Sequence, residues 1–117
     1  MGKITQDHFD LYINGKWVPA KDGATFQTRC PANGELLADC AQATREDVDE
    51  AVSAAWDAFQ SWRNVTTNER AAILNRIADV IEANLDKIAL AESWDNGKPI
   101  RETLNADIPL AVDHFRY

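Results

Sequence analysis

The sequence lacks the clustered residues that mark a self-contained active site. A phosphate-binding loop needs glycines gathered between a strand and a helix, because only bare backbone can approach a pyrophosphate. The five glycines are instead scattered, at Gly2, Gly15, Gly23, Gly34 and Gly97. The two cysteines, Cys30 and Cys40, have neither CxxC spacing nor a nearby histidine. We therefore predict no nucleotide site, no zinc or redox site and no nucleophilic cysteine, and we expect both cysteines to be reduced thiols.

Basic residues and long apolar runs are also scarce. Twelve Lys and Arg against 19 Asp and Glu give a formal net charge of -7, which repels phosphate backbones and anionic lipid surfaces. No stretch approaches the roughly 18 apolar residues of a membrane-spanning helix, and the first ten residues do not resemble a secretory signal. The sequence therefore predicts a cytoplasmic protein that binds neither nucleic acid nor membranes.

The composition is that of a globular protein with one modest core. Hydrophobic residues make up 45% of the 117 and charged residues 26%, far from the signature of disorder. We predict one segment, 1–117, with a flexible terminus at 1–8, small strands and turns over 9–43, and helices over 44–117. Asn14-Gly15, inside an alternating stretch, predicts a type I′ hairpin turn. Further turns are expected around Gly23 and Pro31.

Helical periodicity begins at Thr44. Thr44 and Asp47 have capping-box spacing and precede an amphipathic helix, and Thr66 and Glu69 open a longer one. In the second helix, Asn84 is a predicted break, and apolar residues occupy more than one face. Gly97 followed by Pro99 predicts a left-handed cap and then the start of a third helix, which Pro109 should kink.

One polar cluster has the composition of a cation site. Asp95-Asn96-Gly97-Lys98 lies at a predicted helix end, where carbonyl oxygens and a carboxylate can converge on a cation, although the residues alone favour a plain helix cap. His8 in the terminus and His114 among aromatic residues are not expected to be catalytic. The four tryptophans are interpreted as packing residues.

Three motifs together resemble the opening of the aldehyde dehydrogenase superfamily. They are Tyr12-Ile13-Asn14-Gly15-Lys16-Trp17, Pro31-Ala32-Asn33-Gly34-Glu35 and Trp94-Asp95-Asn96-Gly97-Lys98-Pro99. Each is weak alone, but their order and spacing are specific. The similarity runs from about Phe9 to the end, and the last stretch, through His114-Phe115-Arg116-Tyr117, looks most like the bacterial acetaldehyde dehydrogenase branch. Cys30 stands where the family usually has Asn, a small departure.

The resemblance implies a longer parent enzyme that oxidises an aldehyde to a carboxylic acid with NAD or NADP. The family's nucleophilic cysteine, general-base glutamate, Rossmann-like cofactor domain and oligomerisation segment lie beyond the matched region. No catalytic or cofactor-binding residue is therefore expected here, and no cofactor is expected to bind this chain alone. Family members often bind a structural Na⁺ or K⁺, which the resemblance assigns to the main-chain oxygens of Thr28 and Arg29 and to Asp95.

These expectations define an α+β fold, in which a short antiparallel β-hairpin region precedes three or four helices, as a partial aldehyde dehydrogenase fold without its Rossmann-like sheet. The expected function is that of an N-terminal fragment, inactive alone, whose partner is the remainder of the enzyme or a second copy of itself. A stand-alone helical module that binds a protein is the alternative, and a truncated product of a frameshift or premature stop is a third interpretation.

Overall fold

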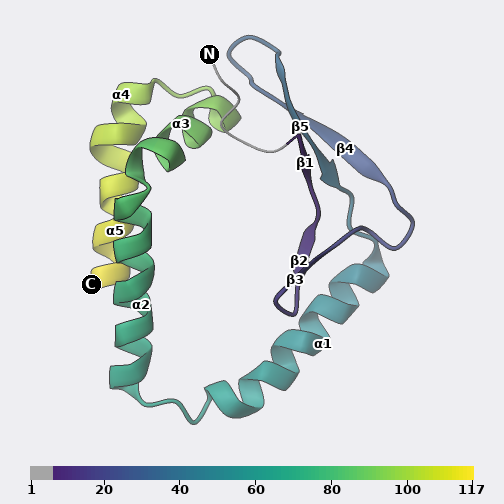
Figure 1. Ribbon diagram of the computed structural model, residues 1–117, viewed down its shortest axis with the longest axis vertical. Coiled ribbons are helices and arrows are strands. Elements are labelled where there is room, and N and C mark those ends of the chain that lie inside the picture. The colour runs from purple at the N-terminus through teal and green to yellow at the C-terminus, as the bar shows by residue number, and fades with distance from the viewer. Residues whose placement is uncertain (1–6) are drawn as a thin grey trace. The chain divides into compact units, whose positions relative to one another are not determined.

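A computed structural model describes residues 7–117, which form two compact units. The strand unit comprises residues 7–28 and Leu36–Val65, and the helical unit comprises Arg29–Glu35 and Thr66–Tyr117. Strands and helices lie in the predicted order (Figure 1). The predicted α+β fold with its early strands and later helices is confirmed. Of the predicted flexible terminus, residues 1–6 lie outside the described residues.

The strand unit contains the predicted hairpin. Strands β2 (Leu11–Ile13) and β3 (Lys16–Val18) pair antiparallel, with Ile13 opposite Lys16. Both turn residues have positive φ, 51° at Asn14 and 75° at Gly15, as a type I′ turn requires. The Asn-Gly prediction is therefore confirmed in its turn geometry as well as its position.

A second sheet was only partly predicted. Strands β4 (Thr25–Arg29) and β5 (Leu36–Ala41) are neighbours in it, and β1 (His8–Phe9) joins the other side of β5. The β1 strand runs parallel to β5, with His8 opposite Asp39 and Phe9 opposite Cys40. His8 thus belongs to a strand rather than to the terminus. A two-residue strand gives no alternating pattern, and its partner lies far along the chain, so neither its existence nor its direction was readable.

The first helix, α1 (Arg45–Trp62), begins at the predicted capping box. Thr44 accepts a hydrogen bond from the Asp47 amide, and Asp47 Oδ2 accepts from the Thr44 amide and hydroxyl, each at 2.8 Å. The same carboxylate oxygen accepts from the Lys21 amide at 3.3 Å. These bonds, the Thr44 amide first, lower the pKa of Asp47, which is only 3% exposed. The Asp47 side chain therefore completes the cap of α1 and also holds in place the turn that contains Lys21.

The apolar stripe of α1 remains at the surface. Val48 and Phe59 are both exposed, and Trp56 is 65% exposed. The helix is amphipathic as predicted, yet within this chain its apolar face is not buried. The buried apolar residues of the strand unit are three alanines, Ala20, Ala38 and Ala41. Small side chains of this kind bury little area, so the strand unit has a thin core.

In the helical unit, a short helix lies alongside part of a longer one (Figure 1). Helix α2 (Thr67–Ala83) packs against α5 (Ile108–Arg116), with Ala78 fully buried on one side and Ile108 and Val112 buried on the other. The guanidinium of Arg116 bonds Asp79 at 2.9 Å and Glu82 at 2.6 Å, which fastens the end of α5 to α2. Helix α3 (Leu85–Asn96) begins after Asn84, at the predicted break.

Pro109 is accommodated by a change of helix type. The chain passes from α4 (Ile100–Glu102) through a π-helical segment, η1 (Thr103–Asp107), into α5, and Pro109 lies in the first turn of α5. The amide of Ile108 donates to the carbonyl of Thr103, five residues earlier. Proline has no amide proton and its ring crowds the carbonyl four residues before it, so a wider turn at this point relieves both problems.

The second capping box provides a test of how much one cap contributes. Thr66 accepts from the Glu69 amide at 3.3 Å and donates its hydroxyl to Glu69 at 2.7 Å. We expect Thr66→Ala to lower the free energy of unfolding by about 1 kcal/mol, because the first turn of α2 loses its side-chain partner. Urea unfolding followed by far-UV circular dichroism would measure it.

Thr67→Ala is the matched control. Thr67 is the next residue, is also exposed and makes no side-chain hydrogen bond to any residue in 7–117. Its replacement should change the free energy by less than about 0.5 kcal/mol. Equal losses in the two variants would contradict the capping role of Thr66.

Candidate functional site

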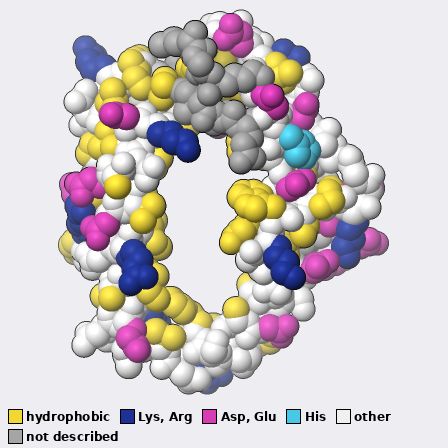
Figure 2. Space-filling view, in the orientation of Figure 1, with side chains coloured by type: hydrophobic (Ala, Val, Ile, Leu, Met, Phe, Trp, Pro, Cys, Tyr) yellow, Lys and Arg dark blue, Asp and Glu magenta, His cyan; other side chains and the backbone are white. Residues whose placement is uncertain are grey.

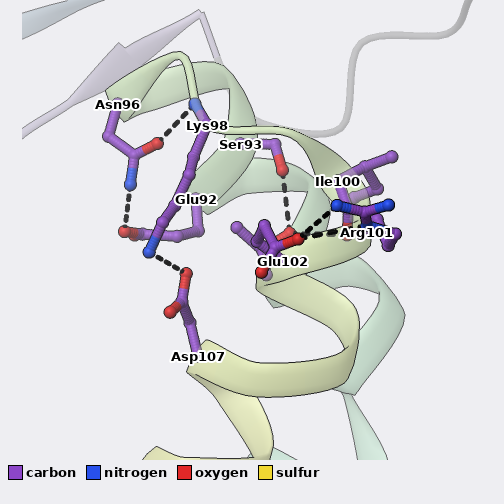
Figure 3. Close-up of polar contacts among 9 residues, drawn as sticks. Glu92, Ser93, Asn96, Lys98, Ile100, Arg101, Glu102 and Asp107 are labelled. Atoms are coloured by element: carbon purple, nitrogen blue, oxygen red, sulfur yellow. Dashed lines mark hydrogen bonds and ion pairs between the residues drawn. The ribbon is translucent and has the colours of Figure 1, made fainter.

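The polar cluster at Asp95-Asn96-Gly97-Lys98 forms the end of helix α3 (Figure 3). Gly97 has a φ of 76° and donates its amide to the carbonyl of Ser93 at 3.0 Å. This is the predicted left-handed cap, a conformation in which a side chain would collide with the following carbonyl. The cap turns the chain sharply, so that Pro99 can lead into α4.

The polar atoms of Asn96 are both used within this turn. Its Oδ1 accepts from the Lys98 amide at 2.7 Å, and its Nδ2 donates to Glu92 Oε1 at 2.6 Å (Figure 3). The side chain therefore closes a local turn after the helix and also ties it back to the last helical turn. Both partners lie within four residues of Asn96, as expected for a structural cap.

Lys98 connects the cap to the π-helical segment. Its Nζ lies 2.6 Å from Asp107 Oδ2, and both side chains are partly exposed (Figure 3). The hydrogen bond to Asp107 is the main reason that the pKa of Lys98 is raised. Since ion pairs open to solvent contribute little to stability, this pair positions Lys98 more than it stabilises the unit, and it leaves Lys98 fully protonated at neutral pH.

Beneath the surface, one buried hydrogen bond joins α3 to η1. Ser93 Oγ and Thr103 Oγ1 lie 2.8 Å apart, and Thr103 is completely buried. Thr103 Oγ1 also donates to the Ile100 carbonyl at 3.1 Å. Neither residue is predictable from the sequence, because isolated Ser and Thr residues inside helical patterns carry no sign that they face each other across a helix pair.

Gly97 also makes room for the Pro31 turn. A side-chain carbon built on Gly97 would lie 3.0 Å from Pro31 Cγ and 3.4 Å from the Ala32 amide nitrogen. The Pro31 and Gly97 motifs, far apart in sequence, are therefore in contact within the helical unit. The turn itself closes through the Gly34 amide, which donates to the Cys30 carbonyl at 2.8 Å, and through the Cys30 amide, which donates to Glu35.

The three residues assigned to a monovalent cation lie as follows. Arg29 ends β4, is exposed, and donates from Nη1 to the Gly34 carbonyl at 3.2 Å. Asp95 is exposed near the end of α3, two residues before the Gly97 contact, so its segment and that of Arg29 meet in the helical unit. Thr28 is half-buried and belongs to the strand unit. Over residues 7–117, no group of three His, Cys, Asp or Glu side chains is arranged to hold a metal ion.

The histidines and cysteines have local surroundings. His8 Nε2 lies 3.0 Å from Asp10, and His114 Nδ1 lies 2.7 Å from the Leu110 carbonyl. Cys30 is buried, Cys40 is half-buried, and both are free thiols. Neither histidine contact involves a cysteine.

What the described residues build around Gly97 is a structural junction, in which a turn, a helix cap and a π-helical segment meet.

The close approach at Gly97 can be tested with a matched pair of glycines. Gly97 and Gly34 both have a φ of 76°, but nothing lies within 4 Å of a side-chain carbon built on Gly34. Alanine in the left-handed region costs roughly 1–2 kcal/mol. We expect Gly34→Ala to lose about that much stability and Gly97→Ala to lose clearly more, because Pro31 must also move. Thermal unfolding of both variants would measure the difference, and equal losses would show that the contact does not matter.

Comparison with known proteins places these motifs in a family. The family model described as "Aldehyde dehydrogenase family" matches residues 17–117. The EPTC-inducible aldehyde dehydrogenase of Rhodococcus erythropolis is 54% identical over 112 residues, which cover 96% of this chain and 22% of that protein. Acetaldehyde dehydrogenase 2 of Cupriavidus necator is 51% identical, with the same coverage.

Solved structures agree with the sequence relatives. The NAD⁺ complex of aldehyde dehydrogenase from Bacillus cereus superposes with a TM-score of 0.90 at 42% identity, covering 94% of this chain and 23% of that one. The chain thus spans between a fifth and a quarter of the length of these relatives. A match over residues 17–117, with the fold conserved, shows that the chain belongs to the aldehyde dehydrogenase family.

Proposed function

We propose that this chain is one segment of a longer NAD(P)-dependent aldehyde dehydrogenase, and that it supplies packing surfaces and not reacting groups. The observation that carries the proposal is the combination of a nearly complete family match with coverage of only 22% of the relatives' length. The reaction of the whole enzyme would be oxidation of an aldehyde to a carboxylic acid. The resemblance to the acetaldehyde dehydrogenase branch favours a small aldehyde as the substrate.

The chain's contribution would be made through its exposed apolar faces. On α1, Val52 is exposed and Trp56 is 65% exposed, and on α2, Ile73 and Val80 are exposed. Hydrophobic side chains are visible at the surface along α2 (Figure 2). Exposed apolar area of this extent costs free energy until something covers it. In this proposal the remainder of the enzyme covers these faces, and self-association covers them when the chain is alone.

The cofactor would bind outside this chain. The Bacillus cereus relative has been solved as an NAD⁺ complex, which supports NAD or NADP as the cofactor of the whole enzyme. The scattered glycines of this chain offer no phosphate-binding loop. No helix of the described residues is long and apolar enough to cross a membrane. The cytoplasmic location inferred from the sequence remains part of the proposal.

A graft tests whether the chain is such a segment. We expect the 117-residue chain alone to reduce neither NAD nor NADP in the presence of acetaldehyde, because it supplies no nucleophile or cofactor site. Replacing the matched 112 residues of the Rhodococcus erythropolis enzyme with the corresponding part of this chain should give a chimaera that still reduces the cofactor when aldehyde is added. The reason is that the fold and the motifs correspond. Absorbance of the reduced cofactor measures both.

The same graft and the isolated chain also test the alternative, in which the chain is a stand-alone interaction module. The exposed apolar stripe of α1 is the observation in its favour. A graft that folds but shows no activity, together with an isolated chain that sediments as a monomer and unfolds cooperatively, would reject the segment and support the module. Turnover by the purified chain alone would reject both.

We also propose that a monovalent cation, Na⁺ or K⁺, binds the main-chain oxygens of Thr28 and Arg29 together with Asp95 in the whole enzyme. Support comes from the family resemblance and from the contact between the Pro31 and Gly97 motifs. Crystals of the graft soaked with Tl⁺ should show an anomalous peak beside Asp95, and Asp95→Ala should weaken it. A peak elsewhere, or none, would contradict the site.

A further inference from the structure

The sequence contains three Asn-Gly dipeptides, Asn14-Gly15, Asn33-Gly34 and Asn96-Gly97. This dipeptide is chemically labile, because the glycine amide nitrogen can attack the asparagine side-chain carbonyl carbon without hindrance from a side chain of its own. All three asparagines are exposed, so access to water does not distinguish them. What distinguishes them is how each side chain and each glycine amide is bonded.

Asn33-Gly34 is held away from the reactive geometry. Asn33 Oδ1 accepts from the Glu35 amide at 3.0 Å, and its Nδ2 donates to Glu35 Oε2 at 3.1 Å. The Gly34 amide, which would have to act as the nucleophile, donates to the Cys30 carbonyl at 2.8 Å. Attack would require these three hydrogen bonds to break together.

Asn96-Gly97 is held in the same way by different partners. Asn96 bonds the Lys98 amide through Oδ1 and Glu92 through Nδ2, at 2.7 and 2.6 Å (Figure 3). The Gly97 amide donates to the Ser93 carbonyl at 3.0 Å. Three hydrogen bonds again fix the side chain and the nucleophile. Each bond that must break slows the reaction by a factor of a few, so three bonds slow it by roughly tenfold or more.

Asn14-Gly15 has none of this protection. The Asn14 amide group and the Gly15 backbone amide make no hydrogen bond to any residue that the structure describes. The turn also belongs to a sheet of two strands only, each three residues long. Two-stranded hairpins are only marginally stable by themselves, so the backbone torsions that the attack needs are within reach by local opening.

We propose that Asn14 is the site of spontaneous deamidation in the folded protein. The Gly15 amide nitrogen loses its proton to solvent base and bonds to Asn14 Cγ, and the side-chain nitrogen leaves as ammonia, giving a five-membered succinimide. Water then adds to one of the two imide carbonyls and breaks its bond to nitrogen. One opening gives aspartate at position 14, and the other gives isoaspartate, with one extra carbon in the main chain.

The two products affect the hairpin differently. Asp-Gly fits a type I′ turn as Asn-Gly does, so the aspartate product keeps the turn and adds one negative charge. The isoaspartate product lengthens the two-residue loop, and loop length sets the pairing register. Pairing of Ile13 with Lys16 would be lost, and with it the Tyr12–Trp17 ring contact, whose centroids lie 4.9 Å apart.

Peptide mapping of the aged chain tests the proposal. The protein would be incubated in mildly alkaline buffer, digested, and analysed by mass spectrometry with fragmentation that separates aspartate from isoaspartate. We expect the peptide containing Asn14 to gain mass at least about tenfold faster than those containing Asn33 or Asn96. The reason is that three hydrogen bonds must break at each of the two protected sites before the glycine nitrogen can attack. Tryptophan fluorescence should change as isoaspartate accumulates.

The same incubation in concentrated urea is the internal control. Unfolding removes every hydrogen bond named above, so the three dipeptides should then react at similar rates. Asn14→Gln should abolish the mass gain of its peptide and leave the others unchanged. Equal rates at the three sites in native buffer, or faster reaction at Asn33 or Asn96, would overturn the proposal.

Discussion

Gly97 is the position on which the helical unit depends. Its left-handed backbone ends α3 and turns the chain into α4, and its missing side chain leaves space for the Pro31 turn. No other residue type satisfies both demands without strain or displacement. The hydrogen bonds around it, from Asn96 to Glu92 and from Lys98 to Asp107, complete a junction whose geometry this glycine already determines.

Local signals predicted much of this structure. The Asn-Gly turn, the two capping boxes, the break at Asn84 and the Gly97 cap all lie where expected. Each of these features depends on residues within a few positions of each other, and their chemistry is specific to turns and helix ends. Such positions can be predicted from a single sequence, because the local structure they require does not depend on tertiary contacts.

Features that depend on distant partners were not predictable. The parallel pairing of β1 with β5 and the buried bond between Ser93 and Thr103 each join segments whose meeting only the fold decides. The π-helical segment before Pro109 is a compromise between proline and the packing of α5. The exposure of the apolar stripe on α1 could not be predicted either, because a periodic pattern shows which face of a helix is apolar but not whether this chain covers that face. The cation residues came from resemblance alone.

The segment from Cys30 to Glu35 has a consequence for the order of folding during synthesis. It closes the turn between β4 and β5, so it can form once the first forty or so residues have left the ribosome. Its second partner, Gly97, is translated much later. Amino-terminal segments leave the ribosome first and can fold first. We therefore expect this turn to form before helix α3 has been synthesised. Helix α3 then packs, through Gly97, against a Pro31 turn that belongs to the same unit and is already formed.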